Sequence, residues 1–319
     1  MTQQLFLVSI DTEAPAGNDA VNNMIYCKTD SGEYGINHIM DMLDSYDIKG
    51  LFFVDIAEAW HYGEEKIKKV LFDIDNRNHD IGVHIHPDHM TDPDRRFLWQ
   101  YSFDEQYEII KKCTEFYESV LGRKPLSFRA GRYGADNNTI KILSMLGYKY
   151  DMSMYYGMKK RCKIDGEFET VNTVKLLPGG VYEIPVTVFK SFDFIGYKRF
   201  DKLDESMPYG EFVGVVKEML TSRSVSVGSF FMHSFSFVDW RKNPNKPVYR
   251  ETNDKRIKAM IDRIVNDKNC RFVCEGDLSA LIESRSTSKD EEKRLEFFSI
   301  WYSTLRAIKI IKEKMIRNI

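Results

Sequence analysis

Cysteines are scarce in this 319-residue sequence, and none is arranged as a metal knuckle. The five are Cys27, Cys113, Cys162, Cys270 and Cys274. An odd, scattered set gives no disulfide framework, and the close pair near the C-terminus has no second cysteine or histidine pair beside it to complete a zinc site. We therefore expect reduced thiols and an intracellular protein.

Long apolar runs and a secretory leader are lacking as well. No 18-residue apolar stretch occurs, so no membrane span is expected. The N-terminus, MTQQLFLVSIDTE, has too short an apolar run for a signal peptide and no basic leader. A formal net charge of −2 excludes nucleic acid as the main partner, because phosphate binding needs a basic face. These features predict a cytoplasmic protein.

Repeats, low-complexity blocks and Pro/Gly-rich linkers are missing from the first 285 residues, which favours one domain over 1–285 and a separate C-terminal segment over 286–319. Apolar runs alternate with helical patterns, which favours a parallel α/β sheet, closed or open. Strands are expected at 5–10, 50–56, 80–86, 126–130, 148–154, 181–187, 227–232 and 271–274. Helices are expected before residue 80 and at 36–45, 102–120, 137–146, 209–221 and 253–267. Residues 156–179 give a weak signal and read as an irregular insertion.

Polar residues follow four of these strands at their C-terminal ends, where chemistry sits in such folds. Asp11-Thr-Glu13 follows the first strand and His84-Ile-His86-Pro the third. Arg129-Ala-Gly-Arg-Tyr133-Gly comes at the end of the fourth, and His233 ends the strand at 227–232. The strands all become polar at one end, so these side chains are expected to converge on a shared centre.

Residues two apart in an extended strand face the same side, so Asp11 and Glu13 can reach one site, and so can His84 and His86. Two imidazoles and one carboxylate suit zinc and leave a position open for water. The alternative for Asp11 and Glu13 is a turn aspartate and a solvated glutamate. Asp88 and His89 are possible substitutes as ligands, while His79 and His38 are expected at the surface.

The other strand-end residues have two interpretations each. Arg129 either orients Asp11 or forms a plain ion pair with Asp151. His233 either donates a proton to a leaving amine or is a buried structural histidine. The glycines beside Tyr133 permit a tight backbone path, so the Tyr133 amide can face an oxyanion.

Taken in order, SIDTE, DIGVHIHP, FRAGRYG and FMHSFSF resemble the motifs of the polysaccharide deacetylase (NodB-homology) family of carbohydrate esterases, in the branch with an HxHP motif. The resemblance implies a distorted (β/α)7 barrel, to which the composition of the C-terminal segment adds a helical extension. It also implies a divalent metal, commonly zinc, and hydrolysis of an N-acetyl group on an amino sugar in surface-glycan biosynthesis. Asp11 matches the catalytic base, His84 the first histidine ligand, Arg129 the arginine that orients the base, and His233 the acid.

Departures from the family pattern concern the metal ligands. Thr12 replaces the usual second aspartate, which binds the metal in the family, so Glu13 must serve as that metal ligand. The usual second histidine position is occupied by Asp88, which makes His86 the second ligand and Asp88 its alternative. Two rival functions stay open: a metal-independent cyclic-amide hydrolase of the same fold, as for allantoin, and a catalytically inactive glycan-binding relative.

The C-terminal segment is apolar and basic, with Phe298, Trp301, Leu305, Ile308 and Met315 at roughly helical spacing. Basic residues follow Trp301 at positions 306, 309, 312, 314 and 317. One interpretation is a helix packed on the domain or on a second subunit of a homo-oligomer. The other is an interfacial helix on anionic lipid at the inner membrane face, which would suit a lipid-linked rather than a nucleotide-linked sugar substrate.

Overall fold

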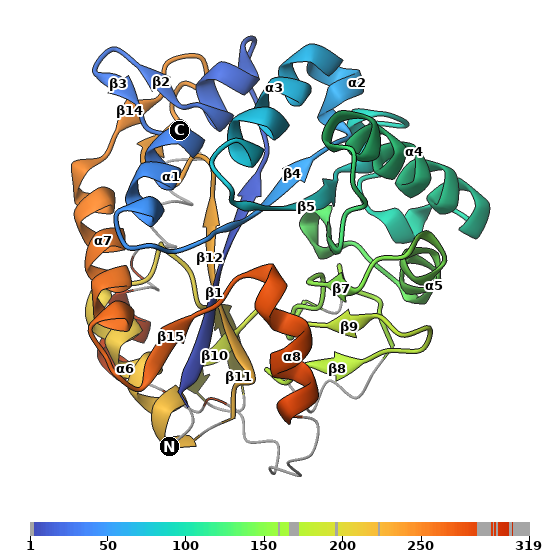
Figure 1. The fold of residues 1–319 in the computed structure, drawn as a ribbon. Coiled ribbons are helices and arrows are strands. Elements are labelled where there is room, and N and C mark those ends of the chain that lie inside the picture. The colour runs from blue at the N-terminus through green and yellow to red at the C-terminus, as the bar shows by residue number, and fades with distance from the viewer. Residues whose placement is uncertain are drawn as a thin grey trace.

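A curled nine-stranded sheet forms the centre of the computed structural model, with helices packed on its outside (Figure 1). The structure describes residues 3–158, 160–165, 172–194, 197–222, 224–285, 295, 297, 299–305 and 308. In spatial order the strands are β12 (Val227–His233), β1 (Gln4–Thr12), β4 (Leu51–Asp55), β5 (Asp80–Ile85), β6 (Ser127–Ala130), β7 (Tyr150–Asp151), β9 (Tyr182–Glu183) and β8 (Lys175–Leu176), and β15 (Cys270–Phe272) also pairs with β1. The strand pairs are parallel except for β8 with β9. This confirms the distorted α/β barrel expected from the sequence.

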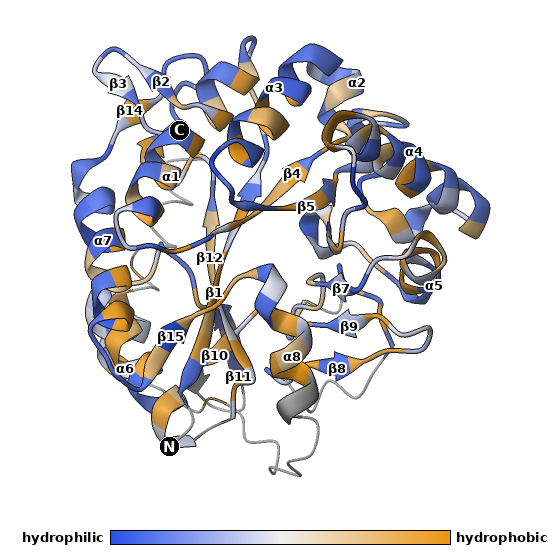
Figure 2. Cartoon of the chain, in the orientation of Figure 1, coloured by the Kyte–Doolittle hydropathy of each residue, from blue (hydrophilic) through white to orange (hydrophobic). Residues whose placement is uncertain are grey.

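Strand β1 is the centre of the sheet, and all nine of its residues are buried. One edge pairs with β12 over seven residues, from Leu5 with Val227 to Asp11 with His233. The other edge is shared, because β15 pairs with its first residues and β4 with its last ones. Such a strand is covered on both faces and both edges, which explains its continuous apolar run. Figure 2 shows the same hydrophobic colouring along β4 and β12.

The helices end where local capping chemistry predicts. Ser102 accepts a hydrogen bond from the Glu105 amide and opens the longest helix with a capping box, and left-handed Gly122 closes that helix. Asp136 and Gly147 cap the next helix in the same way. The helices are α1 (Ile36–Asp44), α2 (Glu58–Tyr62), α3 (Glu64–Asp75), α4 (Phe103–Leu121), α5 (Asn137–Leu146), α6 (Tyr209–Ser222), α7 (Glu251–Val265) and α8 (Glu275–Arg285), with shorter turns η1 (Val21–Ile25), η2 (Pro87–His89), η3 (Leu98–Gln100) and η4 (Gly131–Tyr133).

Three small antiparallel hairpins lie outside the strand–helix alternation and were not predicted. They are β2 (Lys28–Thr29) with β3 (Gly32–Glu33), β10 (Val188–Phe194) with β11 (Tyr197–Lys202), and β13 (Val238–Asp239) with β14 (Val248–Tyr249). The span predicted as an irregular insertion contains β8, and residues 166–171 within it lie outside the described residues. The predicted domain junction at 286–294 also lies outside them. Among the described helices, none is long and apolar enough to cross a membrane.

Gly82 in β5 leaves room for the ring of Phe53 from β4. A Cβ at residue 82 would lie 2.6 Å from two carbons of that ring and 3.2 Å from the Ser127 carbonyl. The other side of the ring carries the Arg129 guanidinium, whose central carbon lies 4.2 Å from the ring centroid. The glycine therefore positions an aromatic support beneath a polar group at the centre of the sheet.

We expect Gly82→Ala to lower the free energy of unfolding by about 1–3 kcal/mol, the usual cost of overpacking a filled core. Gly276→Ala in α8 is the matched control, because its Cβ would meet only the Cys274 sulfur at 3.8 Å, an ordinary contact. Urea unfolding of both variants measures the difference. An equal effect at the two positions would contradict the packing argument.

Candidate active site

The end of β1 brings two carboxylates to one histidine. Asp11 Oδ2 lies 4.0 Å and Glu13 Oε2 lies 3.5 Å from His84 Nε2. Thr12, between them, is fully buried and donates its hydroxyl to the Ile10 carbonyl, away from this group. The alternation expected of an extended strand end is thus the arrangement in the structure, and neither carboxylate is a solvated surface group.

His84 and His86 face the same point from the end of β5. Their Nε2 atoms are 3.1 Å apart, and His86 Nε2 is 2.7 Å from Glu13 Oε2. His84 Nδ1 lies 2.7 Å from the Arg129 carbonyl. Because a carbonyl can only accept, Nδ1 carries the proton and Nε2 presents its lone pair to the site.

Glu13, His84 and His86 fit a divalent metal. Ligands bound tetrahedrally to zinc at about 2.0–2.1 Å are roughly 3.3 Å from one another. The separations among Glu13 Oε2 and the two Nε2 atoms are 2.7, 3.1 and 3.5 Å. The buried Nδ1 of His86 has no hydrogen-bond partner among the described residues, so nothing there fixes its ring tautomer. These three atoms could hold one ion.

Arg129 pairs with Asp11, the first of its two expected partners. Its guanidinium donates to Asp11 Oδ1 at 2.5 Å, and its side chain is fully buried. The second expected partner, Asp151, instead accepts the Ser153 hydroxyl at 2.6 Å. Burial alone would raise the pKa of Asp11, but Arg129 and then His84 outweigh it and hold that pKa below its ordinary value. Asp11 is therefore an anion at neutral pH.

His233 faces the same carboxylates from the end of β12. It is the register partner of Asp11, and its Nε2 lies 3.9 Å from Glu13 Oε1. Burial, and then the positive charge of Lys202, lower the pKa of His233 to about 4. The imidazole is therefore neutral at neutral pH in the free protein.

Tyr133 and its neighbours form a tight left-handed turn after β6. Arg132 and Tyr133 have φ of 54° and 62°, and a Cβ on Gly131 would lie 2.6 Å from the Ile85 carbonyl. The Tyr133 hydroxyl accepts a hydrogen bond from Lys202 Nζ at 3.3 Å. The turn thus brings residues of β6 beside the end of β5, as the glycines predicted.

Asp88, the alternative second ligand, is not part of the group around Glu13. Its carboxylate accepts two hydrogen bonds from Arg132, at 2.7 and 3.1 Å. His79, expected at the surface, is buried, and its Nδ1 accepts the Gly50 amide at 3.2 Å. Its ring lies 5.3 Å from that of Phe52, and its Nε2 lies 3.3 Å from Asp44 Oδ1.

Two further groups near the site were not predicted by the sequence analysis, which named His89 of the second group only as a substitute ligand and missed the other members. Lys202 comes from β11, a hairpin with no signal in the strand–helix alternation. A second cluster, Asp55, Glu58 and His89, lies at the ends of β4 and η2 and the start of α2. Asp55 follows the same strand-end rule as Asp11 and could have been found by it.

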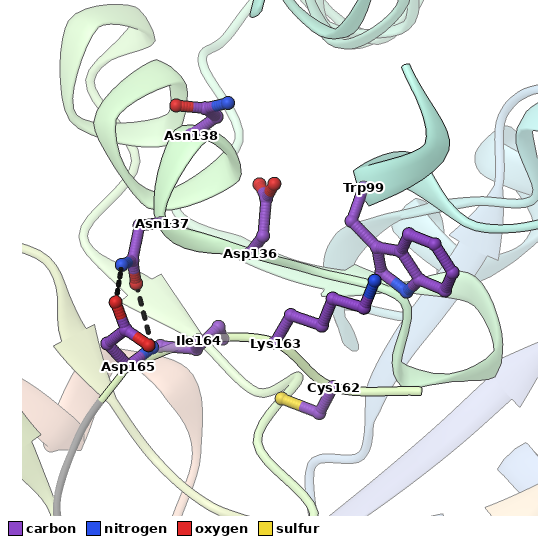
Figure 3. Close-up of a pocket in the computed structure, with 8 residues that line it drawn as sticks. All are labelled: Trp99, Asp136, Asn137, Asn138, Cys162, Lys163, Ile164 and Asp165. Carbon is purple, nitrogen blue, oxygen red and sulfur yellow. Dashed lines mark hydrogen bonds between the residues drawn. The ribbon is translucent and has the colours of Figure 1, made fainter. Parts of the chain in front are cut away.

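A surface hollow of about 610 Å³ lies apart from these residues (Figure 3). Its lining consists of Trp99, Asp136, Asn137, Asn138, Cys162, Lys163, Ile164 and Asp165. The polar groups there are engaged with one another: Asn137 makes two hydrogen bonds with Asp165, and Lys163 Nζ lies 3.2 Å from the centroid of the Trp99 ring. None of the strand-end residues described above lines it.

Known proteins resemble the chain in sequence and in fold. Residues 18–150 match the family model described as polysaccharide deacetylase. A peptidoglycan deacetylase-like protein, FGM2, from Gibberella zeae is 40% identical over 50 residues, which is 16% of this chain and 15% of that protein. The matched segment is thus a small part of the relative's length.

Two solved structures share the fold. A candidate polysaccharide deacetylase from Mycobacterium smegmatis superposes with a TM-score of 0.60 at 14% identity, covering 93% of this chain and 96% of that one. Puue allantoinase gives a TM-score of 0.54 at 13% identity, with 92% of each chain covered. The family model over residues 18–150 and the short sequence match both show a likeness to polysaccharide deacetylases, and the two solved structures share the fold.

Proposed function

We propose that the protein is a metal-dependent hydrolase that removes an N-acetyl group from an amino sugar. The observation that carries the proposal is the convergence of Glu13, His84 and His86 beside the Asp11–Arg129 pair. An ion held by these three ligands would supply an acidified water and an electrophile for the acetamide oxygen. We infer zinc from the two imidazoles and one carboxylate.

The chain's own residues have distinct roles in this proposal. Asp11, an anion fixed by Arg129, accepts the proton of the attacking water. That proton must reach the departing nitrogen, and we assign its relay to His233, the register partner of Asp11. A neutral His233 in the free protein suits a relay, because it can take up a proton before it donates one. The turn at Tyr133 borders the acyl group, with its backbone amide as an oxyanion donor.

We also propose where in the cell the protein acts and which class of substrate it takes. All five cysteines are free thiols, which supports action inside the cell. Among the deacetylases, we place the protein in the HxHP branch, with a glycan precursor of the cell surface as its substrate. The fold shared with Puue allantoinase also hosts other amide chemistry, so a chain that is fully active without metal would favour cyclic-amide hydrolysis.

The described part of the C-terminal segment packs on the domain and leaves an apolar surface outside. The Leu295 carbonyl accepts the Lys190 amide at 3.1 Å, and the Ser303 hydroxyl donates to the Ser191 carbonyl at 2.6 Å. Ile300 and Trp301 remain 75% and 68% exposed. Basic residues follow at positions 306, 309, 312, 314 and 317. We propose that this surface contacts an anionic bilayer, which would bring a lipid-linked sugar to the site.

Removal of metal tests the catalytic proposal. Acetate release from a panel of N-acetylated amino sugars is expected to stop after chelation and to return with zinc or cobalt, because the water loses its activating ion. Elemental analysis before and after treatment gives the metal content. Full activity in a protein shown to be metal-free would contradict the proposal.

Asp11→Asn separates the base from the metal ligands. We expect acetate release to fall by roughly 10²- to 10⁴-fold, the usual contribution of a general base, with the zinc content unchanged. Asp47→Asn is the matched control, because Asp47 is exposed. Loss of zinc together with activity would instead make Asp11 a ligand.

Flotation with liposomes tests the lipid contact. Replacing Ile300 and Trp301 by serine is expected to lower binding to vesicles with phosphatidylserine by roughly 10²-fold or more, since each buried apolar side chain contributes about 1.5–3 kcal/mol and about 1.4 kcal/mol is a factor of ten. Phe72→Ser, at another exposed apolar position, is the control. Equal binding of the double variant and the wild type would remove the lipid proposal and leave the catalytic one intact.

A further inference from the structure

A second group of potential metal ligands lies near the first one, around the end of the neighbouring strand β4. Asp55 ends β4, Glu58 begins α2 and His89 ends η2. His89 Nδ1 is 2.9 Å from Asp55 Oδ2 and 3.9 Å from Glu58 Oε1. One ligand atom from each residue lies within 4.8 Å of the others. Such a group could hold one ion.

The protein itself satisfies only part of this cluster. Asp55 Oδ1 accepts the backbone amides of Ala57 and His86, both at 3.1 Å. Glu58 Oε1 accepts the Ala14 amide at 2.5 Å. The other oxygen of this fully buried carboxyl group, Oε2, has no hydrogen-bond partner among the described residues. A buried oxygen without a partner is costly, so a bonded species is expected there.

The charge of the cluster also indicates that a further species is bound there. Asp55 and Glu58 are both 0% exposed, and among the described residues His89 is the one basic group within ion-pair distance of either. Two ionised carboxylates and one protonated imidazole would leave a net negative charge buried. Desolvation makes such a charge unfavourable, so the cluster needs a further proton or a cation.

We propose that Asp55, Glu58 and His89 form a second divalent-cation site, distinct from that of Glu13, His84 and His86. Two carboxylate oxygens and one imidazole nitrogen suit a transition ion such as Mn²⁺ or Zn²⁺. The site shares no side chain with the first, so each can be removed alone.

The second ion positions the catalytic ligands. Asp55 binds the ion through Oδ2 and the His86 amide through Oδ1, and His89 lies three residues after His86 on the same turn. The Ala14 amide bound by Glu58 directly follows Glu13. An ion between these residues therefore ties the segments that carry His86 and Glu13 to β4 and α2.

Metal stoichiometry tests the inference. The wild type, Glu58→Gln, Glu13→Gln and the double variant are stripped with chelator, dialysed to equilibrium against Mn²⁺ or Zn²⁺, and analysed for metal per chain. We expect two ions in the wild type, one in each single variant and close to none in the double variant, for at least one of the two metals. Glu65→Gln is the matched control, because that side chain is 87% exposed.

Thermal unfolding gives an independent readout. Adding the same ion to Glu13→Gln is expected to raise its Tm by a few degrees, because the remaining site binds only the folded state, and the double variant should show no shift. His89→Asn changes a partly exposed side chain and repeats the test should Glu58→Gln fold poorly. Circular dichroism of each variant without metal identifies folding failures.

The outcomes separate this inference from the proposed function. If Glu58→Gln and His89→Asn both bind as much Mn²⁺ and Zn²⁺ as the wild type, the second site is overturned and a proton occupies the cluster. If Glu13→Gln keeps every ion of the wild type while Glu58→Gln loses one, the second site stands and the proposed catalytic metal falls.

Discussion

The buried guanidinium of Arg129 is the interaction on which the rest of the site depends. It donates to Asp11 and to the Ser9 hydroxyl at 3.1 Å, both on β1, and to the Met152 carbonyl at 3.2 Å beyond β7. A desolvated cation is tolerated there because each of these bonds is made, and removal of its anionic partner would leave it uncompensated. The backbone carbonyl of the same residue receives the His84 Nδ1 proton. One residue thus orients both the Asp11 carboxylate and the His84 imidazole.

Much of this arrangement follows from local rules. The alternation of an extended chain explains why Asp11 and Glu13 approach the same histidine, and why His84 and His86 turn their rings together. Parallel strands all present their carboxyl ends at one side, which explains the approach of His233 to Glu13. Helix caps such as Ser102 and Gly122 likewise depend on neighbouring residues alone.

The other contacts of the site depend on residues that are distant in the sequence. Asp151 lies on β7, which pairs with the Arg129 strand β6, whereas Asp11 lies on β1, three positions along the sheet. Local patterns do not say which carboxylate Arg129 reaches; in the structure it reaches Asp11, with its guanidinium against the ring of Phe53. Lys202 reaches Tyr133 from a hairpin that no strand–helix alternation predicts. Glu58 lies in a helix of five residues, too short for a periodic signal, and its burial beside Asp55 appears only in three dimensions.

The pairing of β1 has a consequence for biosynthesis. Asp11 and Glu13 are synthesised well before two of the strands that flank β1, because β1 has its long edge on β12 and its other edge partly on β15. Until β12 and β15 emerge from the ribosome, β1 keeps an unpaired edge beside a run of mostly apolar residues, a condition that invites aggregation. The nascent chain therefore has to keep β1 sheltered until those strands are made, and the group of residues at the end of β1 cannot assemble before His233 emerges.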